Sequence, residues 1–171
     1  YWTASAYPVH EEDENAFEES CKNTLAEMIR ANRNHPSIIV WSMCNEPFFT
    51  DAGTEQKTRE LLKQLVDLSH KLDPTRPAAI GGAQRGGFDV LGDIAGYNGD
   101  GAAIFHDPGF PNFVSEYGST VSDRPGKFES RYTDGVEIDH PWRSGKAIWC
   151  GFHHGSILGD MGPVSYTHLR A

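Results

Sequence analysis

The sequence contains little cysteine and no long run of apolar residues. Its three cysteines, Cys21, Cys44 and Cys150, lie far apart among 171 residues and form no Cys-x-x-Cys pair. This pattern excludes a disulfide-stapled miniprotein and favours reduced thiols. No apolar stretch approaches the roughly 20 residues that a membrane-spanning helix needs. We therefore expect a soluble protein that has no membrane partner.

Positive charge is scarce as well. The chain has 15 Lys and Arg against 24 Asp and Glu, so its formal net charge is −9. The acidic residues are spread along the chain, which argues against nucleic acid and anionic lipid as partners. Hydrophobic residues nevertheless make up 38% of the sequence, enough for a buried core. With no internal repeat, we expect one structural unit.

Periodic patterns predict alternating helices and strands. Apolar residues recur every three or four positions from Phe17 to Ile29, after an acidic run that suits a helix start, and again over 55–72. Between these helices, residues 37–43 form the β-branched and aromatic run of a strand buried on both faces. Further short strands are predicted at 78–81, 93–96, 112–115 and 147–150. This order predicts an α/β fold with a parallel sheet.

Two glutamates stand where predicted strands end. Asn45 and Glu46 follow the first strand, and Glu116 follows the strand that ends at Ser115. In parallel α/β folds the carboxyl ends of the strands form the ligand-binding edge, so we expect both carboxylates to face one crevice. Two carboxylates across a sugar hydrolyse a glycosidic bond: one protonates the leaving oxygen, and the other attacks the anomeric carbon or activates water. The alternative is that each glutamate is a solvated loop residue.

Three segments resemble glycoside hydrolase family 2, which includes β-galactosidases, β-glucuronidases and β-mannosidases. Residues 34–47, NHPSIIVWSMCNEP, resemble the acid/base segment of that family. Residues 113–119, FVSEYGS, resemble its nucleophile strand, in the same order and at a similar separation. Residues 147–152, AIWCGF, are similar to its eighth barrel strand. Together the three segments span most of residues 30–155.

The resemblance implies a (β/α)₈ TIM barrel, with Glu46 at the end of the fourth strand and Glu116 at the end of the seventh. It implies that Glu46 is the general acid/base, that Glu116 is the nucleophile and that Asn45 hydrogen-bonds the sugar 2-hydroxyl. Tyr97 resembles a sixth-strand tyrosine that contacts the nucleophile. Trp149 resembles a tryptophan that lines the sugar site, the alternative being a core aromatic.

The family hydrolyses terminal β-linked sugars with retention of configuration, through a covalent glycosyl-enzyme. This reaction needs the two carboxyl groups about 5 to 5.5 Å apart, with Glu46 protonated and Glu116 ionised before attack. No cofactor is required; some members use Mg²⁺ or Na⁺, but no residues here match a ligand set. Residues 115–119 with 124–126 are closer to the β-galactosidase branch. The resemblance thus predicts a retaining exo-β-glycosidase that is β-galactosidase-like and acts on a carbohydrate substrate.

Two other functions stay open. One is a non-catalytic carbohydrate-binding barrel, or an inactive fragment of such an enzyme. The other is a metal-dependent hydrolase that uses His153, His154 and Asp160, although their spacing fits no strong zinc pattern. Cys44 has no evident histidine partner and is interpreted as a small core thiol. The glycines of residues 81–87 lack the Lys and Ser/Thr of a phosphate loop and are interpreted as loop residues.

The length of the chain sets a further expectation. A TIM barrel takes about 250 residues, whereas this chain has 171. We therefore expect an incomplete barrel with about strands 3 to 8, residues 1–163 forming the partial catalytic domain and 164–171 an unassigned tail that is non-native or truncated. We expect the natural N-terminus to be absent, and we favour the bacterial cytoplasm as the location. The oligomeric state and the activity of the isolated chain stay open.

Overall fold

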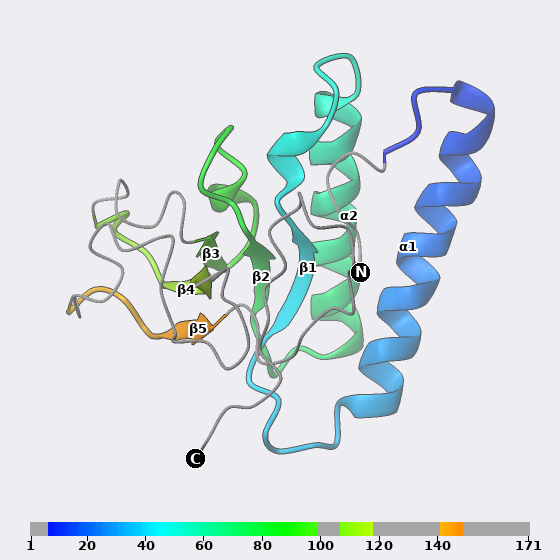
Figure 1. Ribbon diagram of the computed structural model, residues 1–171. Helices are drawn as coiled ribbons and strands as arrows, with labels where there is room; N and C mark the ends of the chain where they lie inside the picture. Colours follow the sequence, from blue (N-terminus) through cyan, green and yellow to red (C-terminus); the bar gives the residue numbers. More distant parts are fainter. Residues whose placement is uncertain (1–6, 99–106, 118–140, 149–171) are drawn as a thin grey trace, which may run out of the picture. The chain divides into compact units, whose positions relative to one another are not determined.

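The computed structural model describes residues 7–98, 107–117 and 141–148, and the chain forms two compact units, residues 1–96 and 97–171. The elements of the first unit are drawn in blue to green in Figure 1. They are, in chain order, α1 (Glu11–Asn32), β1 (Trp41–Asn45), the 3₁₀ helix η2 (Pro47–Phe49), α2 (Glu55–Leu72), β2 (Ala78–Gly81), the 3₁₀ helix η3 (Asp89–Leu91) and the start of β3 (Ile94–Asn98). The second unit holds the end of β3, then β4 (Asn112–Tyr117) and β5 (Lys146–Ile148).

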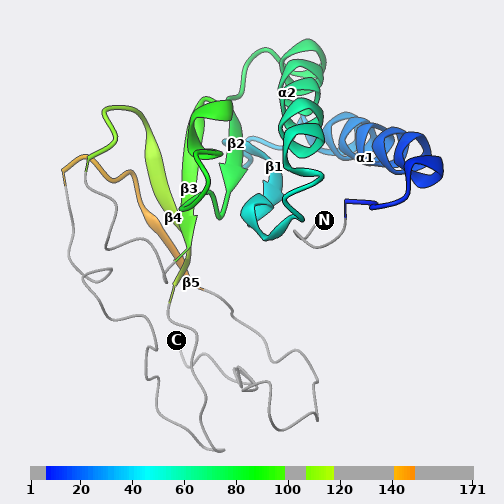
Figure 2. The same cartoon turned by 90° about the horizontal axis from the view of Figure 1, so that it is seen from above.

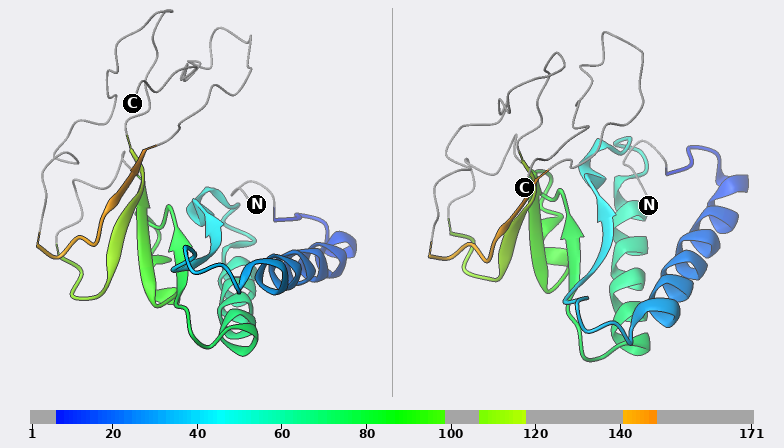
Figure 3. Two further views of the ribbon diagram at one scale, coloured as in Figure 1. Left: turned by 90° about the horizontal axis from the view of Figure 1, so that it is seen from below. Right: turned by 60° about the horizontal axis from the view of Figure 1, so that its bottom comes forward.

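The strands pair in parallel, as the alternation of strands and helices predicts. Strand β1 pairs with β2, and β2 pairs with β3; the arrowheads of β1 and β2 point the same way in Figure 3. In the second unit β4 pairs with β5, with Val114 opposite Lys146. Within each unit, the strands that pair follow one another in the sequence. All four residues of β2 are buried, as expected of a parallel strand covered on both faces.

Helix α2 lies against β1 and β2, and α1 lies beside α2 (Figure 2). The apolar stripe of α2 forms the centre of this packing, and Leu61 and Leu62 have no exposed surface. From α1, Leu25 and Ile29 join the same cluster of buried side chains, whereas Met28 is 37% exposed. The two amphipathic patterns of the sequence therefore meet in one core. Neither helix has an apolar stretch that could cross a membrane, and no other helix in the described part of the chain does.

Every predicted helix and strand is present, but several strand ends differ from the prediction, most of all the start of β1. Helix α2 and strand β2 have the bounds predicted from the sequence. Strand β1 instead begins at Trp41, four residues later than predicted, and Ile39 is 76% exposed. The reason is that the Arg76 guanidinium, and not a neighbouring strand, binds the backbone carbonyls of His35 and Ile38. The prediction of a strand from residue 37 was therefore wrong, because the chain still turns there.

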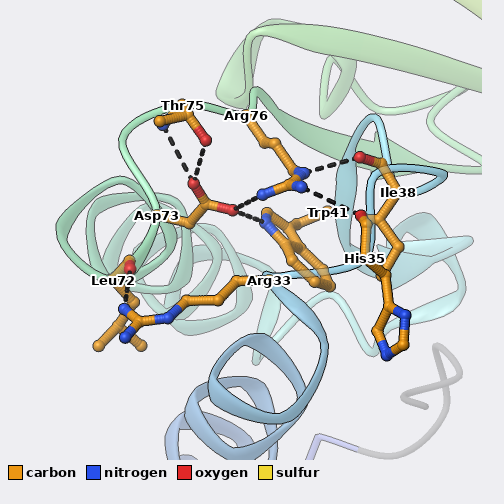
Figure 4. Close-up of polar contacts among 8 residues, drawn as sticks. All are labelled: Arg33, His35, Ile38, Trp41, Leu72, Asp73, Thr75 and Arg76. Atoms are coloured by element: carbon orange, nitrogen blue, oxygen red, sulfur yellow. Dashed lines mark hydrogen bonds and ion pairs between the residues drawn. The ribbon is translucent and has the colours of Figure 1, made fainter.

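A buried carboxylate ties the start of β1 to the turn between α2 and β2 (Figure 4). The Oδ2 atom of Asp73 accepts a hydrogen bond from Trp41 Nε1 at 3.0 Å and pairs with Arg76 Nη1 at 2.6 Å. Its Oδ1 atom accepts hydrogen bonds from the hydroxyl and the backbone N–H of Thr75. The hydrogen bonds from Thr75 and Trp41, together with Arg76, hold the pKa of Asp73 well below its usual range. The charged form of Asp73 is therefore the form that the fold stabilises.

We expect the substitution Asp73→Asn to lower the melting temperature at neutral pH by about 5 °C or more, because the amide cannot accept from all of these donors. Since the pKa of Asp73 is lower in the folded protein, its contribution is present above the unfolded value of about 3.9 and is lost as the pH falls toward the folded value. The difference between wild type and variant should thus be constant above about pH 5 and shrink below pH ~4. Thermal melts across pH 3 to 7 measure this difference. A difference that grew on acidification would contradict the assignment.

Candidate active site

Strand β1 carries a bulge just before the predicted acid/base. Ser42 pairs with Ala79, but Asn45 pairs with Gly81, so three steps along β1 match two along β2. The Ser42 hydroxyl donates a hydrogen bond to the Cys44 carbonyl at 3.1 Å across this bulge. The adjacent residues 43 and 44 are both buried at this point. Bulges of this kind redirect the side chains that follow them, and here these are Asn45 and Glu46.

Glu46 has a backbone conformation that few residues adopt. Its φ and ψ are 51° and 52°, in the left-handed region, and it is the single non-glycine residue with positive φ among those that the structure describes. Its backbone N–H donates to the Gly81 carbonyl at 3.0 Å, and its own carbonyl accepts from Phe49 N at 3.2 Å. Such a conformation costs about 1 to 3 kcal/mol and persists where the surroundings hold it, often at functional sites. The Glu46 side chain is half-buried.

Aromatic and cationic side chains surround the loops at this end of β1 and β2. Phe48 and Phe49 follow Glu46 in η2 with ring centroids 4.5 Å apart, and Phe49 is 53% exposed. The Arg85 guanidinium lies 5.2 Å from the centre of the Phe48 ring. Arg59, from the first turns of α2, lies 4.2 Å over the Phe88 ring. These contacts fix the loop after Glu46 and the loop after β2 by cation–π attraction.

The second unit places Glu116 within a strand. Strand β4 continues to Tyr117, two residues beyond the predicted end, so Glu116 belongs to the strand instead of following it. The neighbouring Ser115 hydroxyl donates to Asn98 Oδ1 of β3 at 2.8 Å, and Asn98 is buried. Tyr97, which precedes Asn98, is only 1% exposed. Glu116 itself is half-buried.

A buried asparagine orders the start of β4. The Nδ2 atom of Asn112 donates to the carbonyls of Phe110 and Trp142 at 3.2 and 3.1 Å. Two residues later, the backbone N–H of Val114 donates a hydrogen bond to the Gly145 carbonyl at 2.9 Å, beside the pairing of β4 with β5. Asn112 has no exposed surface, so these two bonds replace those that water would make to its Nδ2 atom. The strand that carries Glu116 is therefore anchored at its beginning.

The remaining candidates divide into those that the structure describes and those that it does not. Cys44 is buried, and burial raises the pKa of its thiol, which fits the interpretation as a core thiol. Trp149, His153, His154 and Asp160 lie outside the described residues. Among residues 7–98, 107–117 and 141–148, no three His, Cys, Asp or Glu side chains gather as a metal site requires.

Two glycines at the end of β2 have roles that were not predicted from the sequence. Gly81 is the last residue of β2, as predicted, but its carbonyl accepts a hydrogen bond from the Glu46 backbone, which the sequence did not indicate. Gly82 follows with a positive φ of 57°. The signal available in the sequence was a Gly-Gly pair directly after a short apolar strand, a pattern that marks close approach of two backbones.

Comparison with known proteins identifies the fold in which these residues lie. Residues 4–154 match the family described as "Glycosyl hydrolases family 2, TIM barrel domain". The chain belongs to glycoside hydrolase family 2. The match covers both candidate glutamates, Glu46 and Glu116, and its description confirms the predicted barrel class. The five described strands of this family 2 chain are part of a TIM barrel domain.

Relatives of this family 2 chain are longer proteins. It is 48% identical over 63 residues to a Formosa agariphila protein named "Putative beta-glucuronidase", a match that covers 34% of the chain and 8% of the relative. It is 34% identical over 86 residues to a Bacteroides fragilis β-glucuronidase, covering 50% of the chain and 12% of the relative. A solved family 2 structure from Bacteroides cellulosilyticus superposes with a TM-score of 0.57 at 30% identity, over 81% of this chain and 19% of that one. The chain thus spans a small part of each of these relatives.

Proposed function

We propose that this protein is a retaining β-glycosidase in which Glu46 and Glu116 carry out a double displacement. The observation that supports it most is the end of β1, where a bulge and a left-handed backbone present Asn45 and Glu46 at the carboxyl end of a parallel strand. In a TIM barrel domain this end of the strands is where chemistry takes place. Glu116, near the end of β4, supplies the second carboxylate that glycoside hydrolysis requires.

In the first step the Glu116 carboxylate attacks the anomeric carbon while Glu46 donates its proton to the departing glycosidic oxygen. The C–O bond to the aglycone breaks, and an ester between the sugar and Glu116 forms. In the second step the Glu46 carboxylate takes a proton from water, whose oxygen attacks the anomeric carbon and releases Glu116. Both steps pass through an oxocarbenium-like transition state, in which Asn45 holds the 2-hydroxyl. The chemistry needs no cofactor.

Two further side chains have supporting roles in this proposal. The Tyr97 hydroxyl contacts Glu116 and orients it for attack, and the burial of Tyr97 within its strand supports a fixed position for the ring. Trp149 forms the apolar wall against one face of the sugar. Both roles follow from the family resemblance. Tyr97→Phe, which keeps the ring but removes the hydroxyl, tests the first role, and Trp149→Ala, which removes the apolar face, tests the second.

The identity of the sugar is the more specific part of the proposal. The resemblance of residues 115–119 points to β-galactosides, whereas the two curated relatives reported above are named β-glucuronidases. The relatives give a β-galactosidase less support than a β-glucuronidase. We therefore propose a terminal β-linked glucuronide as the first substrate to test, with the β-galactoside as the second. Oligomeric state and location do not bear on this choice.

Labelling with 2-deoxy-2-fluoro glycosyl probes tests the proposal directly, because the fluorine slows hydrolysis of the glycosyl-enzyme so that it accumulates. We expect one probe of a glucuronosyl and galactosyl pair to add its glycosyl mass to the protein. Peptide mapping by mass spectrometry should place the adduct on Glu116. An adduct on another residue, or a product of inverted configuration in the NMR spectrum, would contradict the mechanism. Sugar binding without adduct or turnover would instead establish a carbohydrate-binding barrel.

A further inference from the structure

We propose that Gly82 is a positioning residue for Glu46, the acid/base, and for its neighbour Asn45. This inference rests on the proposed function. Gly82 follows β2 and lies against the end of β1. A Cβ atom at this position would lie 2.6 Å from Glu46 Cγ, 2.7 Å from Glu46 N and 2.8 Å from Asn45 Oδ1. All three distances are well below the roughly 3.5 Å of van der Waals contact. The space that the missing side chain leaves is therefore occupied by Asn45 and Glu46 themselves.

Two connected observations explain why the backbone of Glu46 cannot simply move aside. The backbone N–H of Glu46 is held by the Gly81 carbonyl, one residue before Gly82. The Glu46 backbone is already in the left-handed region, and the buried Pro47 directly after it restricts the chain further. A side chain at position 82 would press on both the backbone and the side chain of Glu46. The side chains, whose torsions are softer than this backbone, are then the parts that shift.

The position is also constrained by its own backbone. Gly82 has a φ of +57°, which side-chain-bearing residues rarely adopt. Strain alone would make any substitution here harmful, so a test must separate strain from the collision with Glu46. Gly87, in the same loop before η3, provides that control. Its φ is +66°, and nothing lies within 4 Å of the position of a Cβ atom.

The test compares Gly82→Ala with Gly87→Ala in the intact protein. Both substitutions place a methyl group on a left-handed backbone, but only the first one meets Asn45 and Glu46. We expect Gly82→Ala to lower kcat on glycosides with poor, alkyl leaving groups by about a hundredfold, since displacements of about 1 Å at a catalytic group have effects of this size. Gly87→Ala should retain kcat within about threefold, because it shares the strain but not the contact.

Labelling of Glu116 by the dinitrophenyl 2-deoxy-2-fluoro glycoside distinguishes positioning from a merely structural role. This probe has a leaving group that needs no proton and lacks the 2-hydroxyl, so its reaction depends neither on Glu46 as an acid nor on Asn45. Gly82→Ala should therefore be labelled at nearly the wild-type rate while it fails on alkyl glycosides. Gly82→Asn should give the same result as Gly82→Ala. Asn tolerates the left-handed backbone better than other side-chain-bearing residues, but it still carries the Cβ atom.

The outcomes separate the two proposals. If Gly82→Ala hydrolyses alkyl glycosides as well as Gly87→Ala does, the positioning role is overturned. If both Gly82 variants lose labelling and hydrolysis together, the glycine serves folding, and the inference is overturned as well. If the wild-type protein and Gly87→Ala neither hydrolyse a glycoside nor take up any probe, the proposed function itself fails. A defect confined to poor leaving groups, with labelling retained, supports the inference.

Discussion

The substitution Glu116→Gln should abolish turnover of every β-glycoside, with kcat/KM falling by at least about four orders of magnitude, as removal of a catalytic nucleophile does in other enzymes. The amide has nearly the shape of the carboxylate, but it is neutral and cannot form the glycosyl ester. Because the first step needs the nucleophile whatever the aglycone, the loss should be the same for alkyl and dinitrophenyl glycosides. Steady-state rates on both substrate types, with mass spectrometry for the missing adduct, measure this loss.

Asp107→Asn is the matched control for the loss of the Glu116 charge. Asp107 lies in the same unit, is exposed, and accepts a hydrogen bond from Gly109 N in a turn. Its neutralisation removes one carboxylate from that unit without touching β4, so activity should stay within about twofold, as for most surface changes. Substantial turnover by Glu116→Gln alongside an intact control would assign the nucleophile to another residue.

The substitution Glu46→Gln should produce a loss that depends on the leaving group. On alkyl glycosides kcat/KM should fall by about a hundredfold to ten-thousandfold, the range that general acid catalysis contributes. On dinitrophenyl glycosides, which leave without a proton, kcat/KM should stay within about tenfold of wild type. The second step still lacks its base, so kcat falls on both substrates. Added azide, an anion that attacks without deprotonation, should restore kcat on the dinitrophenyl substrate.

Glu60→Gln provides the equivalent control in the first unit. Glu60 is an exposed residue of α2 that accepts a hydrogen bond from Gln56, one turn earlier. The same change of charge there should leave both substrate types at wild-type rates. If Glu46→Gln lost activity equally on alkyl and dinitrophenyl glycosides, or did not respond to azide, Glu46 would not be the acid/base.

The elements that the sequence predicted well are those set by local patterns. Helix α2 has its predicted bounds because a stripe of leucines is followed directly by Asp73 and Pro74, which end the periodic pattern. Strand β2 is a short apolar run closed by glycine. The position of Glu46 after a strand was also predictable, because hydrophobicity alone marks where the strand gives way to a loop.

The features that the sequence did not predict depend on neighbours across the sheet. The bulge before Asn45 arises from the register between β1 and β2, and no local signal marks it. The left-handed backbone of Glu46 is unexpected for a glutamate and is held by Gly81, which lies 35 positions later in the chain. The late start of β1 likewise depends on Arg76, which binds two carbonyls of the preceding turn. A single sequence does not show such pairings.

The two ends of strand β1 affect different properties of the protein: stability in acid at its start and the chemistry at its end. Asp73 binds Trp41 at its first residue, whereas Glu46 follows its last. Five extended residues place these ends about 13 Å apart, and substitutions at such separations usually have additive effects. The acid tolerance of the fold can therefore be adjusted at the Asp73 end without altering the specificity or rate of the chemistry at the other. A library aimed at new aglycones would leave the Asp73 end unchanged and vary the loops that follow Glu46 and Gly82.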